Sequence, residues 1–295
     1  MIETILWAIL MPIIVIFTGL IYMGLARKIT ARIHNRYGPP FYQNIIDVIK
    51  LLSKKNTISH GVMFDLGPVF AFTGALLSLY FIPIANKPLF SFQGDIIVVL
   101  YLLVIAPLGM ALGAGNSGNP NAAIGIARAL TLMLGYEVVM VISVVAVMIY
   151  NHSASFMDII NAQKGGIAHW NLWPLFLSAV AMDIAMQAML GEKPFDQPIA
   201  PHEIASGPMV EYGGRYLSML QFYHSIAIIL ETGIFVNLFL GGGNFIWWFV
   251  KSFIVFFIAL LINAVMPRFR IGQAFKFYWS YPGIIGILGL IIILI

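Results

Sequence analysis

Three acidic side chains stand inside long apolar segments of this 295-residue chain: Glu137, Asp183 and Glu231. A charge at the centre of a bilayer costs about 2.5–3.5 kcal/mol on insertion scales, so such acids usually pair or face a hydrated path. His224 shares a helical face with Glu231, and Arg128 precedes Glu137 in the same helical region. Because carboxylates and histidines exchange protons with water, we expect a proton-transfer file; the alternative is that each acid only hydrogen-bonds two helices together.

The segment 191–215 is the chemically densest part of the chain, with four carboxylates and four prolines. The prolines stiffen its backbone, which a merely solvated loop does not need. Glu211 and Arg215 are spaced for a local ion pair. The carboxylates are Glu192, Asp196, Glu203 and Glu211.

The composition excludes several kinds of chemistry. The chain has no cysteine, which excludes disulfides, thiolate nucleophiles and cysteine-ligated iron–sulfur clusters. Its six histidines are scattered singly, without the spacing of a metal or haem site. There is no serine–histidine–acid set, phosphate-binding loop or dinucleotide motif. We therefore expect no catalytic centre, cofactor, metal or nucleic-acid partner in this chain, and electrons, if any, travel through a partner protein.

The elements that must position these groups are membrane helices. Sixty per cent of the residues are apolar and nine per cent are charged, against about 25% charged in soluble domains. A spanning helix needs about 20 apolar residues, and the continuous apolar runs exclude a β-barrel. We expect an all-α bundle of about eight transmembrane helices. The predicted spans are 4–25, 66–85, 96–114, 131–150, 171–190, 221–240, 245–266 and 278–295.

The basic residues predict the orientation of the bundle. With eight spans, 13 of the 16 lysines and arginines fall in loops on one side. The positive-inside rule places that side in the cytoplasm and both termini outside. We expect a single membrane domain over 1–295, with cytoplasmic partner-docking loops at 26–65 and 191–220. Within the first loop, Phe41–Leu52 has the spacing of a short amphipathic helix, suited to the lipid surface or to a partner.

Four short motifs, taken in order, resemble a known family. They run over nearly the whole chain, and together they resemble the membrane-anchor subunit of complex I and, more closely, its homologue in energy-converting membrane-bound hydrogenases. The motifs are Arg36-Tyr37-Gly38-Pro39 with Asp47 and Lys50, Arg128 with Tyr136-Glu137, Pro194-Phe195-Asp196 with Glu203 and Glu211-Tyr212-Gly213-Gly214, and Pro267-Arg268-Phe269-Arg270.

Departures from the complex I pattern favour the hydrogenase branch. Gly38-Pro39-Pro40 runs almost at once into Gln43, where quinone-using enzymes generally carry an insert. Ile199 and Pro201 stand where two glutamates of the complex I loop would align. A quinone tunnel of the usual kind is therefore not expected.

The resemblance implies a coupling subunit without a redox centre of its own. Its partners would be hydrogenase-like large and small subunits and a ferredoxin-like subunit, carrying a nickel–iron centre and iron–sulfur clusters, and antiporter-like subunits that move protons or sodium ions. Asp196, Glu203 and Glu211 would link the redox arm to the membrane, and Glu137 and Asp183 would continue the path. The partner-docking residues would be Arg27, Arg32, Arg36, Asp47, Lys50, Arg268 and Arg270.

Four alternatives remain open on the sequence. A sulfane reductase of the same family has a similar architecture, and a quinone-reactive complex I subunit would use the same loop to line a quinone chamber. A stand-alone secondary transporter would place its substrate between broken helices near the midplane, and no internal repeat supports one. An intramembrane hydrolase would need a nucleophile–base pair, which the sequence lacks.

Overall fold

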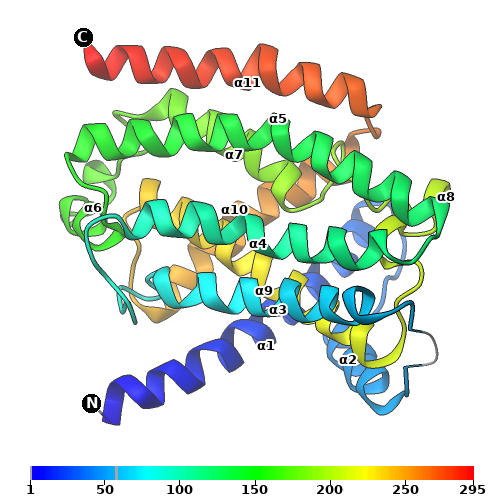
Figure 1. Ribbon diagram of the computed structural model, residues 1–295. Helices are drawn as coiled ribbons and strands as arrows, with labels where there is room; N and C mark the ends of the chain where they lie inside the picture. The colour runs from blue at the N-terminus through cyan, green and yellow to red at the C-terminus, as the bar shows by residue number, and fades with distance from the viewer. Residues whose placement is uncertain (1, 57–58) are drawn as a thin grey trace.

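A computed structural model describes residues 2–56 and 59–295, which form a helical protein without a β-strand (Figure 1). Residues 57–58, inside the predicted docking loop 26–65, lie outside the described residues. The helices are α1 (Ile2–Ile33), α2 (Gln43–Ser53), α3 (Val62–Phe81), α4 (Asp95–Gly115), α5 (Pro120–Asn151), α6 (Phe156–Ala162), η1 (Ile167–His169), α7 (Phe176–Met189), α8 (Pro201–Ile204), η2 (Gly207–Met209), α9 (Gly214–Phe239), α10 (Phe245–Val265) and α11 (Ile271–Leu294).

The predicted polytopic helical membrane fold is confirmed. Seven helices within the described ranges are long and apolar enough to cross a bilayer: α1, α3, α4, α5, α9, α10 and α11. Several extend beyond their predicted ends. In particular, α5 begins at Pro120 rather than near 131, so that it carries both Arg128 and Glu137.

The fifth predicted span, 171–190, is shorter than expected. Only 14 residues form α7, about 21 Å of helix, whereas the hydrocarbon core is about 30 Å thick. The backbone before α7 is diverted to other partners: Leu172 N donates to Phe239 O at 3.1 Å, and Asn171 N donates to Gln163 Oε1 at 3.1 Å. Pro174 has no N–H to add to a helical ladder. The first quarter of the expected span is therefore turns.

Helix α9 is the centre of the bundle. It packs against α1, α2, α3, α7 and α10, and every residue from Ile229 to Phe239 is buried. A helix that is buried on all sides must satisfy its polar side chains from within the protein. Asn237 does so by donating to Pro83 O at 2.8 Å and accepting from Trp248 Nε1 at 2.9 Å.

Glycines allow the helices to pack closely. Such packing matters in a bilayer because the hydrophobic effect does not drive helices together there. Gly109 and Gly113 form a Gly-x-x-x-Gly face on α4 that meets Gly67 of α3. A Cβ added to Gly113 would lie 2.7 Å from Gly67 Cα. On α1, a Cβ added to Gly19 would overlap the carbonyl of Ser225, so α1 and α9 also cross at backbone distance.

The two ends of the bundle differ in composition. Both termini lie at one end in Figure 1, whereas α2 and α8 lie at the other. The predicted amphipathic helix is present as α2, and it packs on α1 and α9. Loops 26–65 and 191–220 meet at that end, where Arg215 N donates to Asn56 Oδ1 at 2.9 Å. We name it the loop end; its cytoplasmic location stays a prediction.

Candidate functional site

An ion-pair network fastens the segment between α7 and α9 to two membrane helices. Arg268, just before α11, donates from Nε and Nη2 to Asp196 at 2.7 and 2.6 Å. Its Nη1 donates to Glu203 Oε1 at 2.8 Å, and Arg128 of α5 donates to Glu203 Oε2 at 2.8 Å. Two carboxylates thus alternate with two guanidiniums, and such charge-assisted bonds are stronger than neutral ones.

The network shifts the ionisation of its members in the direction that keeps them charged. Hydrogen bonds from Arg128 and Arg268 hold the pKa of the Glu203 carboxyl below its usual value. The paired carboxylate of Asp196, with Glu203, raises the pKa of the Arg268 guanidinium above its ordinary value. Both effects favour the ionised network at neutral pH.

The Pro-Phe-Asp motif is locked against the residues that precede α11. Phe269 N donates to Pro194 O at 3.0 Å, and Gln197 Nε2 donates to Pro194 O at 2.9 Å and to Phe269 O at 3.0 Å. The Phe195 ring stacks near Tyr278 of α11, with centroids 4.7 Å apart. The rigidity that the prolines predict is therefore reinforced by backbone contacts between two distant motifs.

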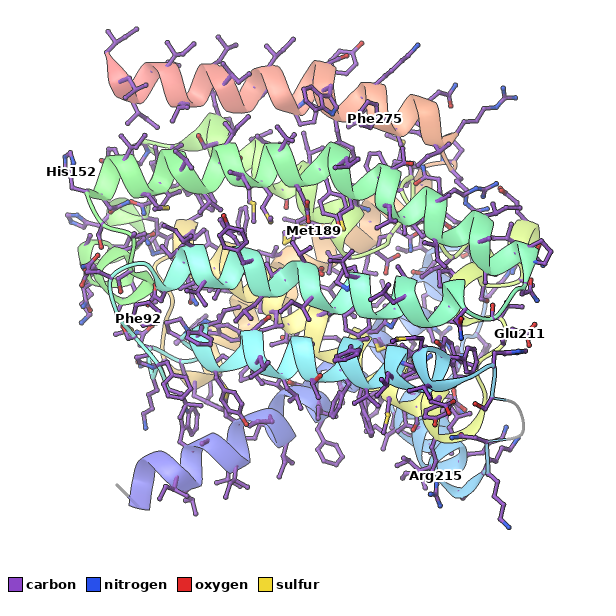
Figure 2. All side chains as sticks on the ribbon, viewed as in Figure 1. Phe92, His152, Met189, Glu211, Arg215 and Phe275 are labelled. Carbon is purple, nitrogen blue, oxygen red and sulfur yellow. The ribbon has the colours of Figure 1, made fainter. Side chains whose placement is uncertain are left out.

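The predicted ion pair between Glu211 and Arg215 is wrong. Figure 2 shows both residues at the loop end, but α9 begins only at Gly214, so the two residues do not share one helix. Glu211 instead accepts from Asn119 Nδ2 at 2.5 Å and lies 3.7 Å from His60 Nε2. It therefore joins the α4–α5 connection to the segment before α3.

A cavity of about 330 Å³ opens behind the network. Its walls are mostly apolar, with polar groups gathered at its two ends. Near the loop end it includes Asp196 of the network, and at depth it reaches Glu231, about 25 Å along α9 from its first residue. The polar lining residues are Arg27, Asn44, Glu192, Asp196, Tyr136, Tyr223, His224 and Glu231.

A second cavity, of about 60 Å³, adjoins the first and reaches Glu137. The two cavities share Tyr136, Tyr223, Glu231 and Met189, which lies near the middle of the bundle in Figure 2. The Glu231 carboxylate stands at the junction, and its Oε2 is buried without a hydrogen-bond partner among the described residues. The structure thus brings four predicted path residues to this pair of cavities: Asp196 of the loop, Glu137 on α5, and His224 and Glu231 on α9. Arg128 lines neither cavity and contacts Glu203 instead.

Asp183 lies apart from this pair of cavities. It lines a separate groove of about 370 Å³, together with Lys251, and shares no lining residue with the other two. Gln187, one turn further on, is a structural tie, because its Nε2 donates to Lys193 O at 2.7 Å and to Ala259 O at 3.0 Å. Asp183 and Gln187, four residues apart on α7, therefore lie in two different surroundings.

Glu192 is a site residue that the sequence did not distinguish from its neighbours. It is half-buried at the cavity, beside Asp196. Burial raises the pKa of the Glu192 carboxyl to about 7; the charge of Asp196 raises it further and Lys193 opposes the shift. In sequence it is one of four loop carboxylates, and nothing in its spacing shows that it faces inward.

The predicted docking residues surround the same end. Arg27 Nη1 donates to Asn44 Oδ1 at 2.7 Å and to Asp47 Oδ2 at 3.3 Å, and with Lys50 they line a hollow of about 300 Å³. Arg27 also lines the larger cavity, so it stands between the two spaces.

The remaining docking residues face outward. Arg32 lies over the Tyr37 ring, 4.7 Å from its centroid. Arg36 and Arg270 are exposed. Together they make the loop end a basic surface around the ion-pair network.

Comparison with known proteins identifies relatives of the whole chain. A family model described as NADH dehydrogenase matches residues 5–294. Among solved structures, a chain of the membrane-bound sulfane sulfur reductase, an archaeal respiratory membrane complex, superimposes with a TM-score of 0.94. That chain is 44% identical, and the alignment covers 99% of each chain.

Arg268→Ala is expected to lower the free energy of unfolding by about 1–3 kcal/mol, because two carboxylates lose a charged donor. Thermal unfolding in detergent measures the effect. Arg270→Ala, two residues away and exposed, is the matched control and should change little. Equal losses in the two variants would contradict the role assigned to the network.

Glu192→Gln is expected to flatten the pH dependence of stability. The pKa of Glu192 is about 7 in the folded chain, against about 4.3 in the unfolded chain. Between these two pH values the folded chain binds more protons than the unfolded chain, so the stability of the wild type falls as pH rises. At pH 8 the variant should be more stable by about 1–3 kcal/mol, and at pH 4 the two should coincide. Unfolding midpoints from pH 4 to 8, with Asp47→Asn as control, test this; an unchanged slope would refute it.

Proposed function

The chain belongs to the NADH dehydrogenase family, and from that premise we propose that it is the membrane-anchor and coupling subunit of a respiratory membrane complex. In this role it joins a peripheral redox arm to ion-translocating membrane subunits. The observation that carries the proposal is the set of acids that line two adjoining cavities, from Asp196 and Glu192 at the loop end to Glu231 and Glu137 deep in the bundle.

The loop end supports docking of the redox arm. Its exposed arginines surround a segment that is held by the ion-pair network, so a soluble partner would meet a preformed surface. The chain has no cysteine, and we propose that hydrogenase-like large and small subunits and a ferredoxin-like subunit carry the nickel–iron centre and iron–sulfur clusters.

The interior supports proton transfer as the coupling step. Glu192 and Asp196 lie beside the docking surface, and His224, Tyr136 and Glu231 continue inward along the cavity wall. A carboxylate such as Glu231, whose buried Oε2 has no hydrogen-bond partner in the part of the chain that the structure describes, can take up a proton and release it when the water or charge around it changes.

The end of α9 opposite the loops is closed. Gln163 Nε2 donates to the carbonyls of Asn237 and Leu238 at 3.1 and 3.2 Å, and Lys251 Nζ donates to those of Leu240 and Gly242 at 2.6 and 2.7 Å. With these groups occupied, the route favoured for an ion is sideways, toward antiporter-like subunits, rather than straight through this chain.

The redox reaction of the complex is a separate question from the coupling role of this chain. The 44% identity to a sulfane sulfur reductase chain supports that branch. The short connection after Gly38-Pro39 supports the hydrogenase branch equally. In both branches this chain would have the same coupling role. A quinone-reactive complex is the third candidate.

Extraction of the chain from its native membrane in a mild detergent tests the assignment. We expect it to co-purify with iron–sulfur subunits and antiporter-like membrane subunits. Sulfane sulfur reduction, hydrogen evolution from reduced ferredoxin, or quinone-dependent turnover of that material would identify the branch. Recovery as a single protein that transports a solute would refute the coupling role.

Glu231→Gln is expected to lower the number of ions moved per electron at least about tenfold, because an amide cannot carry the proton. Proteoliposomes containing the purified complex, with simultaneous readout of proton and sodium gradients, measure the ratio. Asp158→Asn is the control, since Asp158 binds Gln93 and Ser153 at the opposite end of the bundle. An unchanged ratio in Glu231→Gln would exclude this residue from the path.

A further inference from the structure

The groove that Asp183 lines differs from the two cavities that meet at Glu231. It is a groove of about 370 Å³ between α7, α9 and α10. The buried ring of Phe235 on α9 forms its floor, Val180 of α7 lies on one wall, and Ile254 and Ile258 of α10 lie on the other. The two isoleucines are exposed and four residues apart, so they form a ridge along the open side.

Asp183 places a carboxylate inside this apolar groove. It lies about 10 Å along α7 from the first residue of that helix, in the middle of its 14 residues, and is half-buried. Among the described residues, none donates a hydrogen bond to it. Lys251, at the end of the groove, is engaged elsewhere: its Nζ donates to two carbonyls at 2.6 and 2.7 Å and lies 4.4 Å from the Trp170 ring centroid.

The occupant of the groove must therefore supply a donor at the depth of Asp183. A lipid acyl chain has none, and a polar group left unsatisfied in hydrocarbon is strongly disfavoured. A transmembrane helix can present a hydroxyl, amide or basic side chain at that depth. The buried Ala179 beside Asp183 keeps that wall of the groove low enough for the backbone of another helix to approach.

We propose that this groove receives a transmembrane helix of another subunit of the complex, and that this helix donates a hydrogen bond to Asp183. Helices α7 and α10 both lie against α9, and the groove between them is the place for a further helix in the bundle. The proposal rests on the proposed function only in requiring that other membrane subunits are present.

Photo-crosslinking within the intact complex tests this interface. The amino acid p-benzoylphenylalanine replaces Ile254 in one variant and Ile258 in a second, in case the first fails to assemble. The matched control carries it at Ile284 of α11, which has a similar exposure of 56% against 52% for Ile254. After irradiation of native membranes, we expect Ile254 and Ile258 to give an adduct with a different membrane subunit.

The dependence on Asp183 separates specific docking from proximity. Asp183→Leu should reduce the yield of that adduct about fivefold or more, as expected for the loss of one interhelical hydrogen bond, whereas Asp183→Asn should retain it. The products formed from Ile284 should not respond to either change. An adduct with lipid only, an adduct with a second copy of this chain, or a yield independent of Asp183 would overturn the proposal.

The two proposals fail separately. If the chain is extracted without other subunits, the coupling role fails. If the complex is recovered but Ile254 and Ile258 react only with lipid, the coupling role stands and the docking groove fails.

Discussion

The alternation of Asp196, Arg268, Glu203 and Arg128 is the interaction on which the rest of the site depends. Charges near a membrane surface must be hydrated or paired, and here each carboxylate is paired with an arginine from another part of the chain. Asp196 and Arg268 are both mostly buried, so their attraction is less screened than that of an exposed pair. By joining α5, the loop and the start of α11, the network sets the shape of the cavity behind it.

A second constraint comes from the lipid. Helix α9 is buried on all sides, so its polar groups must be satisfied inside the bundle, and most of them are. Glu231 is the exception, since its Oε2 has no partner among the described residues. An unpaired buried polar atom is costly to stability, so its position at the junction of two cavities is better explained by a task than by packing.

Helical periodicity, loop charge and motif order predicted much of this arrangement. Seven of the predicted spans, the amphipathic α2 and the rigid loop follow from local patterns that survive in three dimensions. The length of α7 does not follow from local patterns, because the backbone N–H groups of Asn171 and Leu172 donate hydrogen bonds to residues outside the helix. The pairing of Glu211 could not be predicted either, because it depends on where α9 begins, at Gly214. The inward position of Glu192 depends on how the loop folds back.

The contrast between a rigid loop and a partly hollow interior bears directly on coupling. The cavity behind the network has mostly apolar walls with polar groups set along it, so transfer of a proton through it would need water between those groups. Glu203 contacts arginines on both sides of the loop, so a partner that displaces the loop strains both pairs at once. In the proposed coupling role, this arrangement is the link through which a redox event outside the membrane would control whether the interior acids are connected.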